Sequence, residues 1–381
     1  MLAGFSAFLD LYATQPLLPF LARTFHASAL RVSLTVTAPA LAVAIAAPIV
    51  GRIADRCGLR LMIVASAFAL AAATLLAATA ASLTQLIGWR LVQGLTTPGM
   101  FAVAYIHEEW PAASAGSATA AYVSGTVVGG FTGRALMGTI ASAFGWHASF
   151  VVLGALNAAA AVFLWRQLPA ERPRHDRESD SVRGAVSTHF RNPQLLATYA
   201  IGFCILCAQV ATFTYIPFHL AAPPFNLSTA ALGWIFVTYL LGAVVTPLAG
   251  RAIDRFGRRR PFLAAVVVGV GAMLATLAPA LTPVIAGLTF FATSVFVTQA
   301  IASSHVGAAT TDGRALAVGL YSTFYYIGGS IGSALPAAVW ARGGWTACVA
   351  LIVGVQIVMA IIALACWTDV GRGEVLAEAL G

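Results

Sequence analysis

Long apolar runs alternate with short polar segments along almost the whole chain. A membrane-spanning helix needs about 20 mostly apolar residues, each adding 1.5 Å. Twelve runs fit this description: 3–22, 33–50, 61–81, 84–106, 116–141, 148–168, 194–218, 230–249, 261–279, 282–304, 315–340 and 345–367. The pattern predicts an all-α, polytopic membrane protein with twelve transmembrane helices.

One long polar segment, residues 169–193, interrupts this alternation at the middle of the chain. It is rich in arginine and acidic residues, which is typical of a solvated linker. The predicted organisation is a six-helix bundle in residues 1–168, a cytoplasmic linker, and a second six-helix bundle in residues 194–381.

The two halves are related by an internal repeat. Gly51–Arg60 (GRIADRCGLR) returns 199 residues later as Gly250–Arg259 (GRAIDRFGRR). Five further positions keep the same offset: Tyr122, Gly129, Gly130, Gly133 and Trp146 recur as Tyr321, Gly328, Gly329, Gly332 and Trp345. Parallel repeats of this kind place a substrate site between the halves, near the membrane midplane.

Composition agrees with a bilayer environment. Hydrophobic residues make up 60% of the chain and charged residues 9%, whereas soluble domains carry about 25% charged residues. The net charge of +8 does not indicate nucleic acid, because the arginines gather at predicted helix ends. The bilayer, and no nucleic acid, is the expected partner surface.

The placement of arginine predicts the orientation. If the N-terminus is cytoplasmic, 16 of the 21 arginines lie on cytoplasmic segments or helix ends, and three (Arg23, Arg31, Arg342) lie outside. The positive-inside rule favours this topology, with both termini cytoplasmic.

A removable signal peptide is not expected, because Met1 leads into an apolar run without a basic region or cleavage site. The short tail usual before a first helix is missing, so the true start is expected upstream.

No cofactor or metal is expected. Cys204 and Cys207 lie in a predicted membrane helix without His or acidic neighbours, so we expect them to face lipid or the core. The chain also lacks a phosphate-binding loop that ends in Lys-Ser/Thr, so no motif indicates ATP as the energy source.

Several motifs together resemble the Major Facilitator Superfamily of secondary transporters, and the resemblance covers essentially the whole chain. The loop signature after the second helix matches Gly51, Asp55, Arg56, Gly58 and Arg60, and departs at Leu59, where a basic residue is usual. Its second copy is fuller: Gly250, Asp254, Arg255, Gly257, Arg258 and Arg259. Arg90, Gln93 and Gly94 match a fourth-helix signature, and Gly125–Gly138 is similar to the glycine-rich fifth helix of exporters.

The resemblance implies two pseudo-symmetric bundles that work by alternating access, with a monomer as the usual form. In the family, the first-half Asp, here Asp55, contacts the start of the eleventh helix, here around Asp312–Leu316, and holds the cytoplasmic side shut. The alternative is that both loops only set topology through positive charge.

Glycines at a spacing of four form a bare face on the fifth helix and on its repeat. Such faces let neighbouring helices approach closely. The set consists of Gly125, Gly129, Gly130, Gly133, Gly328, Gly329 and Gly332. Two interpretations stay open: simple packing, or a sliding contact between the halves.

Asp10 is the only carboxylate inside a predicted membrane helix, and Arg90 and Arg134 are the only cations predicted to be buried. A charge at mid-membrane is costly unless it is paired or protonated. We measured the depth of each residue from the outer end of its own helix, at about 1.5 Å per residue. Asp10 then lies ~19 Å deep, Arg134 ~15 Å and Arg90 ~10 Å. Asp10 and Arg134 are therefore close enough in depth to pair. A static salt bridge and a proton-coupling site both remain open.

In this superfamily the first, fourth, seventh and tenth helices line the cavity. The polar and aromatic residues predicted to line the cavity are Tyr12, Gln15, Gln93, Gln209, Tyr215, Gln299 and Tyr325. Such a cavity is poor in fixed charge and suits a neutral, amphipathic or sugar-like solute, although the two arginines keep a weak anion open.

The sequence thus predicts a transporter of the drug- and sugar-efflux-like branch that exports a small organic solute across a bacterial inner membrane, coupled to protons. The alternatives are proton symport or facilitated uptake of a sugar or organic acid and, more remotely, a membrane enzyme or a channel.

Overall fold

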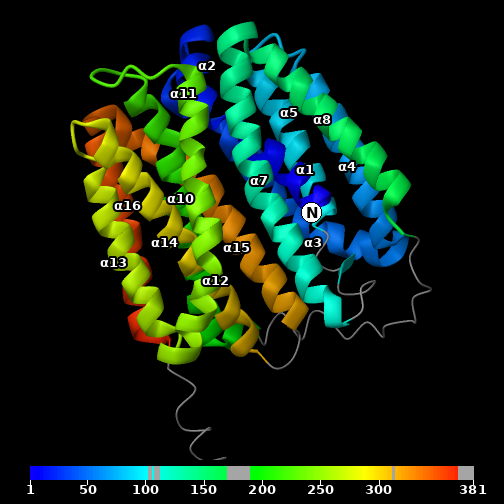
Figure 1. The fold of residues 1–381 in the computed structure, drawn as a ribbon, viewed down its shortest axis with the longest axis vertical. Coiled ribbons are helices and arrows are strands. Elements are labelled where there is room, and N and C mark those ends of the chain that lie inside the picture. Colours follow the sequence, from blue (N-terminus) through cyan, green and yellow to red (C-terminus); the bar gives the residue numbers. More distant parts are fainter. Residues whose placement is uncertain (102–104, 107–111, 170–188, 311–313, 368–381) are drawn as a thin grey trace, which may run out of the picture.

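The computed structural model describes residues 1–101, 105–106, 112–169, 189–310 and 314–367, and these residues form helices and connecting turns without a strand. The helices lie in two groups side by side (Figure 1). The N-terminal half comprises α1 (Leu2–Leu11), η1 (Gln15–Leu17), α2 (Leu18–Thr24), α3 (Ala29–Cys57), α4 (Leu59–Ala77), α5 (Leu83–Thr96), η2 (Thr97–Met100), α7 (Ala112–Phe144) and α8 (Trp146–Gln167). The C-terminal half comprises α10 (Pro193–Leu220), α11 (Thr229–Trp234), η3 (Ile235–Val237), α12 (Thr238–Phe256), α13 (Arg259–Ala275), α14 (Leu281–Ala308), α15 (Arg314–Ala334) and α16 (Pro336–Cys366).

Each predicted apolar run has a helical counterpart, but some runs are interrupted. The run at 3–22 breaks into α1, η1 and α2, with Pro16 and Pro19 at the starts of η1 and α2. Proline has no backbone N–H to continue a helix, although it fits the first turn of a new one. The run at 230–249 is likewise divided into α11, η3 and α12. The predicted linker 169–193 lies mostly outside the described residues.

Two pairs of glycines with positive φ lie at helix junctions, or at a kink inside α16 in the case of Gly344, at equivalent places in the halves. Gly58 (φ 92°) separates α3 from α4, and Gly257 (φ 76°) separates α12 from α13. Gly145 (φ 83°) and Gly344 (φ 55°) form the second pair, again 199 residues apart. A positive φ is unfavourable for residues with a Cβ, so this backbone conformation explains why both copies of the loop motif keep these glycines.

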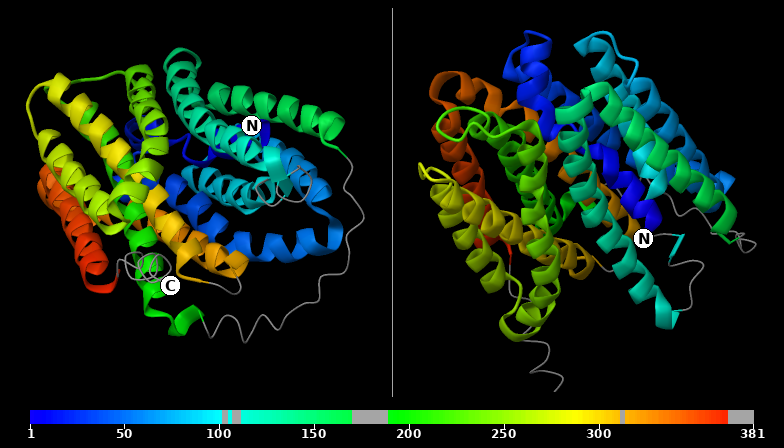
Figure 2. Two further views of the ribbon diagram at one scale, coloured as in Figure 1. Left: turned by 60° about the horizontal axis from the view of Figure 1, so that its bottom comes forward. Right: turned by 45° about the horizontal axis from the view of Figure 1, so that its top comes forward.

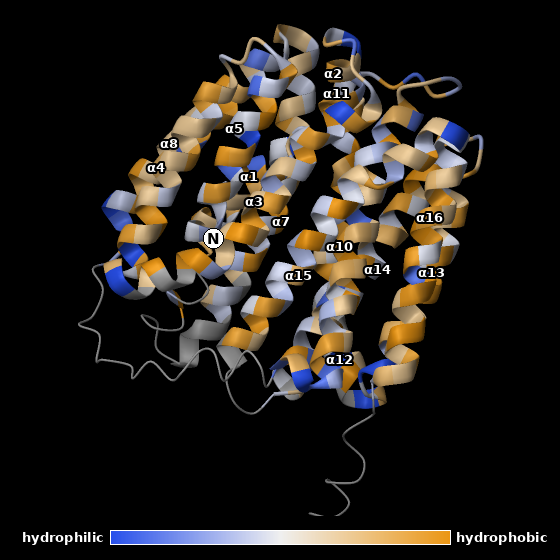
Figure 3. Cartoon of the chain, turned by 180° about the vertical axis from the view of Figure 1, so that it is seen from behind, coloured by the Kyte–Doolittle hydropathy of each residue, from blue (hydrophilic) through white to orange (hydrophobic). Residues whose placement is uncertain are grey.

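The described part of the chain has seven helices that are long and apolar enough to cross a membrane. Large apolar side chains are exposed on the outside of the bundle, among them Val244, Val267 and Leu61. In Figure 3 the hydrophobic residues cover the outer faces, and many of the hydrophilic residues gather near helix ends. An apolar surface of this extent fits lipid and not water, so the fold is that of a polytopic membrane protein.

Helix pairing follows the repeat. Within the N-terminal half α1 packs on α7 and α4 on α8, and within the C-terminal half α10 packs on α15 and α13 on α16. The most extensive contacts between the halves are α3 against α15 and α7 against α11, and η1 also contacts α10. The two groups also stay distinct in the views of Figure 2. The functional side chains described next lie where α1, η1 and α7 face the C-terminal half, and at the centre of the N-terminal half.

Candidate functional site

Asp10 is fully buried in the last turn of α1. Its Oδ2 accepts hydrogen bonds from Thr74 Oγ1 of α4, at 2.8 Å, and from Asn157 Nδ2 of α8. Its Oδ1 has no hydrogen-bond partner among the described residues. The carboxyl group is therefore half-satisfied: one oxygen is held by two neutral donors, and the other is free to carry a proton.

Arg90 of α5 donates hydrogen bonds to the backbone of the same turn of α1, but not to the carboxylate of Asp10. It donates to the carbonyl oxygens of Asp10 (2.8 Å), Leu11 (2.7 Å) and Thr35 (2.9 Å), and to Gln93 Oε1 (2.6 Å). The first two carbonyls belong to the end of α1, where the backbone acceptors lack helical partners. Arg90 thus caps the broken first helix, and its charge lies beside Asp10.

Gln93 belongs to this cluster and not to an open cavity. Its Nε2 donates to Thr74 Oγ1 at 2.8 Å, and its Oε1 accepts from Arg90. The fourth-helix signature therefore links the cation to the carboxyl group through Thr74. Asn157 and Thr74 were missed by the sequence analysis, although Asn157 could have been noticed as the one amide at the centre of the 148–168 run.

The predicted pairing of Asp10 with Arg134 is wrong. Arg134 of α7 donates through Nε to Gln15 Oε1 (2.8 Å) and through Nη1 to the carbonyl of Gly130 (2.7 Å). Its guanidinium also lies over the rings of Tyr12, Phe236 and Tyr239, at 5.3, 4.7 and 5.2 Å from their centroids. Similar depth in the membrane did not imply contact, because Asp10 faces α4 and α8 while Arg134 faces the C-terminal half.

The other residues predicted to line a cavity are divided between several places. Tyr12 and Gln15 join Arg134 where the halves meet, and Gln15 Nε2 also donates to Thr214 Oγ1 of α10 (3.3 Å). Tyr215 is buried against Phe218 and Trp340 of its own half. Tyr325 lies within ring contact of Tyr321 and Tyr326, Gln209 is buried on α10, and Gln299 is half-buried on α14.

The glycine faces make contacts inside each half. A Cβ added at Gly125, Gly129 or Gly133 would meet the backbone of α1 or of Met1 just before it, and one at Gly328 or Gly332 would meet the backbone of α10. The hypothesis that these faces slide between the halves is therefore wrong for these five. Gly130 lies against the Arg134 guanidinium, and Gly329 lies against Leu206 and the hydroxyl of Tyr12. The close glycine contact between the halves is Gly138 of α7 against Gly233 of α11.

Comparison with known proteins places this geometry in a family. The sequence matches the Major Facilitator Superfamily over residues 1–223 and 220–378, which together span nearly the whole chain. The chain belongs to the Major Facilitator Superfamily. This is a superfamily of membrane transporters, which sets aside the enzyme interpretation.

Relatives cover almost the full length. The chain is 29% identical over 367 residues to the inner membrane transport protein YnfM of Escherichia coli (strain K12), covering 94% of this chain and 87% of that protein. It is 29% identical over 354 residues to the MFS-type transporter YybF of Bacillus subtilis (strain 168), covering 92% and 88%.

Two solved structures share the fold. A bacterial homologue of the human lysosomal transporter Spinster, in an inward-facing and occupied conformation, superposes with a TM-score of 0.79 at 17% identity, covering 96% of this chain and 95% of that one. The nucleoside transporter NupG superposes with a TM-score of 0.75 at 14% identity, covering 96% and 98%. At these identities the likeness concerns the fold alone.

The superfamily's loop signature bonds the last helix of each half. Arg60 donates to the carbonyls of Leu168 (2.8 Å) and Trp165 (3.2 Å) at the end of α8. Arg259 donates to the carbonyl of Leu364 in the last turn of α16, at 2.7 Å. Because 165 and 364 also differ by 199, the two arginines make the same contact in each half. Cations suit the C-terminal ends of helices, so these residues stabilise each bundle.

The rest of the signature can be placed only in part. Gly51, Asp55 and Asp254 lie in α3 and α12, but the structure does not describe their side chains. Asp312 lies outside the described residues, so the expected contact of Asp55 near 312–316 stays a prediction. Arg56, Arg255 and Gly250 are exposed, and Arg258 Nε donates to Ser304 Oγ at 3.3 Å.

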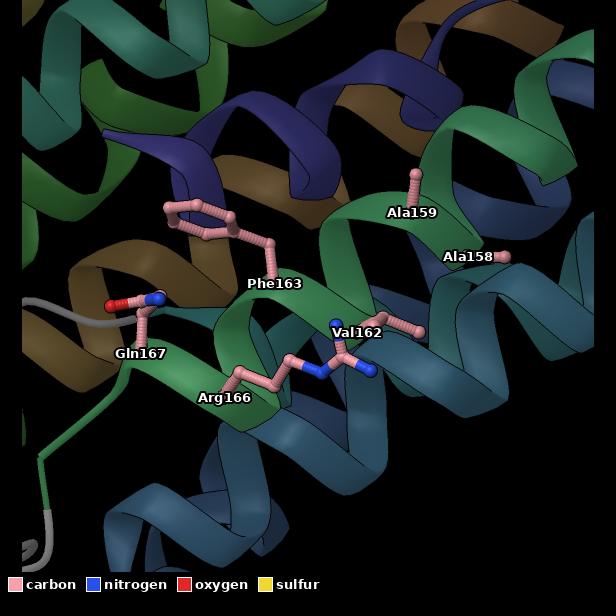
Figure 4. A pocket seen from close by; sticks show the side chains of 6 residues that line it. All are labelled: Ala158, Ala159, Val162, Phe163, Arg166 and Gln167. Atoms are coloured by element: carbon pink, nitrogen blue, oxygen red, sulfur yellow. The ribbon is translucent and has the colours of Figure 1, made fainter.

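A surface pocket on α8 is not part of this site. It is lined by Ala158, Ala159, Val162, Phe163, Arg166 and Gln167, which project from one side of the helix (Figure 4). At 100° per residue this side is opposite to Asn157, whose amide faces Asp10. The pocket therefore lies on the outside of the N-terminal half.

Proposed function

We propose that this protein is a proton-coupled secondary transporter that exports a small organic solute across the bacterial inner membrane. Helices α1 to α8 and α10 to α16 act as two bundles, residues 1–168 and 194–381, joined by the cytoplasmic linker 169–193. Both termini are cytoplasmic, in keeping with the concentration of arginine at one end of the bundle.

One observation carries the proposal: the buried carboxyl group of Asp10, with one oxygen bonded and the other without a partner in the described structure. Thr74 and Asn157 donate to Oδ2 whether or not Oδ1 is protonated. The group can therefore change its protonation state without losing its position. Its neighbour Arg90 is committed to backbone carbonyls, so it does not form a salt bridge that would fix Asp10 as a carboxylate.

Contacts between the halves favour alternating access. Thr37 Oγ1 and Ser333 Oγ are 2.7 Å apart, Gln15 bonds Thr214, and Gly138 contacts Gly233. Thr37 lies near the start of α3, and Ser333 and Gly138 lie near the ends of α15 and α7, so all three contacts lie toward the end of the molecule that carries α2 and α11. In the proposed topology this end faces outward, and the described state is closed to the outside.

The test is proton flux in liposomes loaded with a pH-sensitive dye. Candidate solutes (drugs, sugars and organic acids) are added to reconstituted wild type, Asp10→Asn and Asp10→Glu. We expect solute-driven proton movement for wild type, partial activity for Asp10→Glu, and none for Asp10→Asn, because an amide keeps the hydrogen bonds but cannot release a proton. Uphill, proton-coupled transport by Asp10→Asn would show that another group carries the proton. The direction of flux separates export from the symport alternative.

A further inference from the structure

The contact region between the halves contains a buried positive charge, Arg134, that has no counterion among the described residues. Arg134 is 4% exposed, and its described partners are Gln15 Oε1, the Gly130 carbonyl and three aromatic rings. The Nη2 amino group donates to none of the described residues. A guanidinium has five N–H donors, so Arg134 retains several that no described side chain uses.

Arg90 provides the contrast. It is also fully buried, but Nε, Nη1 and Nη2 all donate, and its four acceptors are three carbonyls and an amide. These bonds are internal to the N-terminal half. Arg90 therefore has a complete structural role, whereas Arg134 presents unused donors where α1, α7, η3 and α12 meet.

The balance of charge inside the membrane region is positive. The buried charges of the apolar runs are two arginines, Arg90 and Arg134, and one carboxylate, Asp10, because Arg166 at the end of the 148–168 run is exposed. Even with Asp10 ionised, one positive charge is left over, and the carboxylate does not contact Arg134. A buried cation is costly in the membrane, and cation–π contacts with Tyr12, Phe236 and Tyr239 offset only part of that cost. A bound anion would supply the missing counterion.

The surroundings of Arg134 define the rest of the ligand. The three rings come from both halves, Tyr12 from the end of α1, and Phe236 and Tyr239 from η3 and α12. The hydroxyl of Tyr12 is buried and has no partner among the described residues. A guanidinium fork with free N–H donors suits a planar carboxylate, and the rings suit an apolar or aromatic body.

We propose that Arg134 is the substrate-binding cation of this transporter, and that its substrates are organic acids with one carboxylate and an apolar or aromatic body. This inference rests on the proposed transport function and specifies its small organic solute as an anion, in place of the neutral or sugar-like solute that the sequence favoured. The carboxylate pairs with the free side of Arg134, and the Tyr12 hydroxyl donates to it.

The test compares acids with their uncharged amides. Equilibrium binding to purified protein, without any ion gradient, is measured for three pairs: 1-naphthoate and 1-naphthamide, benzoate and benzamide, cyclohexanecarboxylate and its amide. A hydrogen bond to a charged group predicts a preference of about 10- to 100-fold for at least one acid. If no acid binds more tightly than its amide, the assignment is wrong, and this result requires no variant.

Variants then assign the preference to one residue. Arg134→Gln is expected to abolish it, and Arg134→Lys to keep part of it, because a lysine retains the charge but not the bidentate fork. Gln15→Glu puts a carboxylate against Arg134 Nε and is also expected to abolish the preference. Arg166→Gln, which removes an exposed charge from α8, is the matched control and should bind like wild type. Full preference in correctly folded Arg134→Gln would overturn the inference.

The two proposals fail separately. If no acid binds more tightly than its amide, but a neutral solute drives an Asp10-dependent proton flux, then only the assignment of the substrate is wrong. With an Arg134-dependent acid preference but without proton flux, the anion site stands and the coupling mechanism is wrong.

Discussion

Gln15 of η1 donates a hydrogen bond to Thr214 of α10 at 3.3 Å, and these two residues occupy equivalent positions in the two halves. Their separation of 199 residues equals the offset of the internal repeat. The first helix of each half therefore meets its own counterpart at this point. Because Gln15 also accepts from Arg134, one amide joins the two halves to the buried cation.

The same symmetry relates the two lateral contacts between the halves. Thr37 of α3 bonds Ser333 of α15 at 2.7 Å. The positions that correspond to them by the offset are Phe236 and Arg134, whose ring centroid and guanidinium are 4.7 Å apart. One contact is thus a hydroxyl pair and the other a cation–π pair. The asymmetry puts the charge on one side of the contact region only.

We predict that Thr37→Cys with Ser333→Cys forms a disulfide readily. The short distance between the two hydroxyls brings the Cβ atoms near the separation a disulfide requires. The five native cysteines are first replaced by serine, and a protease site is inserted in 169–193. After cleavage, the halves should migrate together on a non-reducing gel. Thr37→Cys with Gly319→Cys is the control, since Gly319 lies ~21 Å along α15 from Ser333. Equal crosslinking of both pairs would contradict the described contact.

Substituting a glycine that contacts a neighbouring helix should destabilise the protein. At Gly332 an added Cβ would overlap the carbonyl oxygen of Cys207, whereas at Gly319 on the same helix it would meet no described atom of another helix within 4 Å. We expect Gly332→Ala to cost about 1–3 kcal/mol, as overpacking does. Gly319→Ala should be neutral or slightly stabilising, because alanine favours a helix. Melting temperatures of the purified proteins measure both effects. An unchanged Tm for Gly332→Ala would exclude the close approach of α15 and α10.

Thr74 connects the carboxyl group of Asp10 to Gln93, and its removal should weaken the whole cluster. Thr74→Val keeps the shape but removes a donor to Asp10 Oδ2 and the acceptor of Gln93 Nε2. Leaving buried polar groups unpaired costs about 1–3 kcal/mol each. Both the Tm and the proton flux are therefore expected to fall. Thr323→Val is the control, because that hydroxyl bonds only a carbonyl of its own helix. A drop of equal size in both variants would mean that the Asp10 cluster adds no stability.

Cys57 provides a test of orientation with the native sequence. It is exposed at the end of α3, whereas Cys204, Cys207 and Cys348 are buried. In the proposed topology the end of α3 is cytoplasmic. A membrane-impermeant maleimide should thus label Cys57 in inside-out vesicles and not in right-side-out vesicles. Cys57→Ser identifies the labelled site and controls for the half-buried Cys366. Labelling in right-side-out vesicles alone would invert the topology.

The repeat and the membrane spans could be predicted because they depend on local composition. About 20 apolar residues are needed to cross a bilayer whatever surrounds them, and Gly58 and Gly257 are required by the backbone at their own positions. Asp10 could be identified for the same reason, since a carboxylate in an apolar run is conspicuous by itself. The breaks after α1 and α11 were not predicted, although Pro16 and Pro19 marked the first of them.

The partners of the buried groups could not be predicted. The spacing of Gly125, Gly129 and Gly133 indicated close helix packing, but the helix they contact is α1 of their own half. The pairing of Asp10 with Arg134 was predicted from their similar depth along the membrane normal. In the structure the two side chains point in different directions, because each helix is rotated differently about its axis. Asn157 and Thr74 are ordinary polar residues until folding brings α4 and α8 to the end of α1.

The all-helical membrane fold, the two related halves and the presence of three buried charges could therefore be read from the amino-acid order alone. These follow from the period, length and polarity of each segment. The hydrogen bonds of Thr74 and Asn157 to Asp10, and the position of Arg134 among aromatic rings from both halves, became apparent from the packed helices and not before. The physical reason is that contacts depend on how each helix is rotated and tilted against its neighbours. That orientation results from packing over the whole bundle, between residues far apart in the chain.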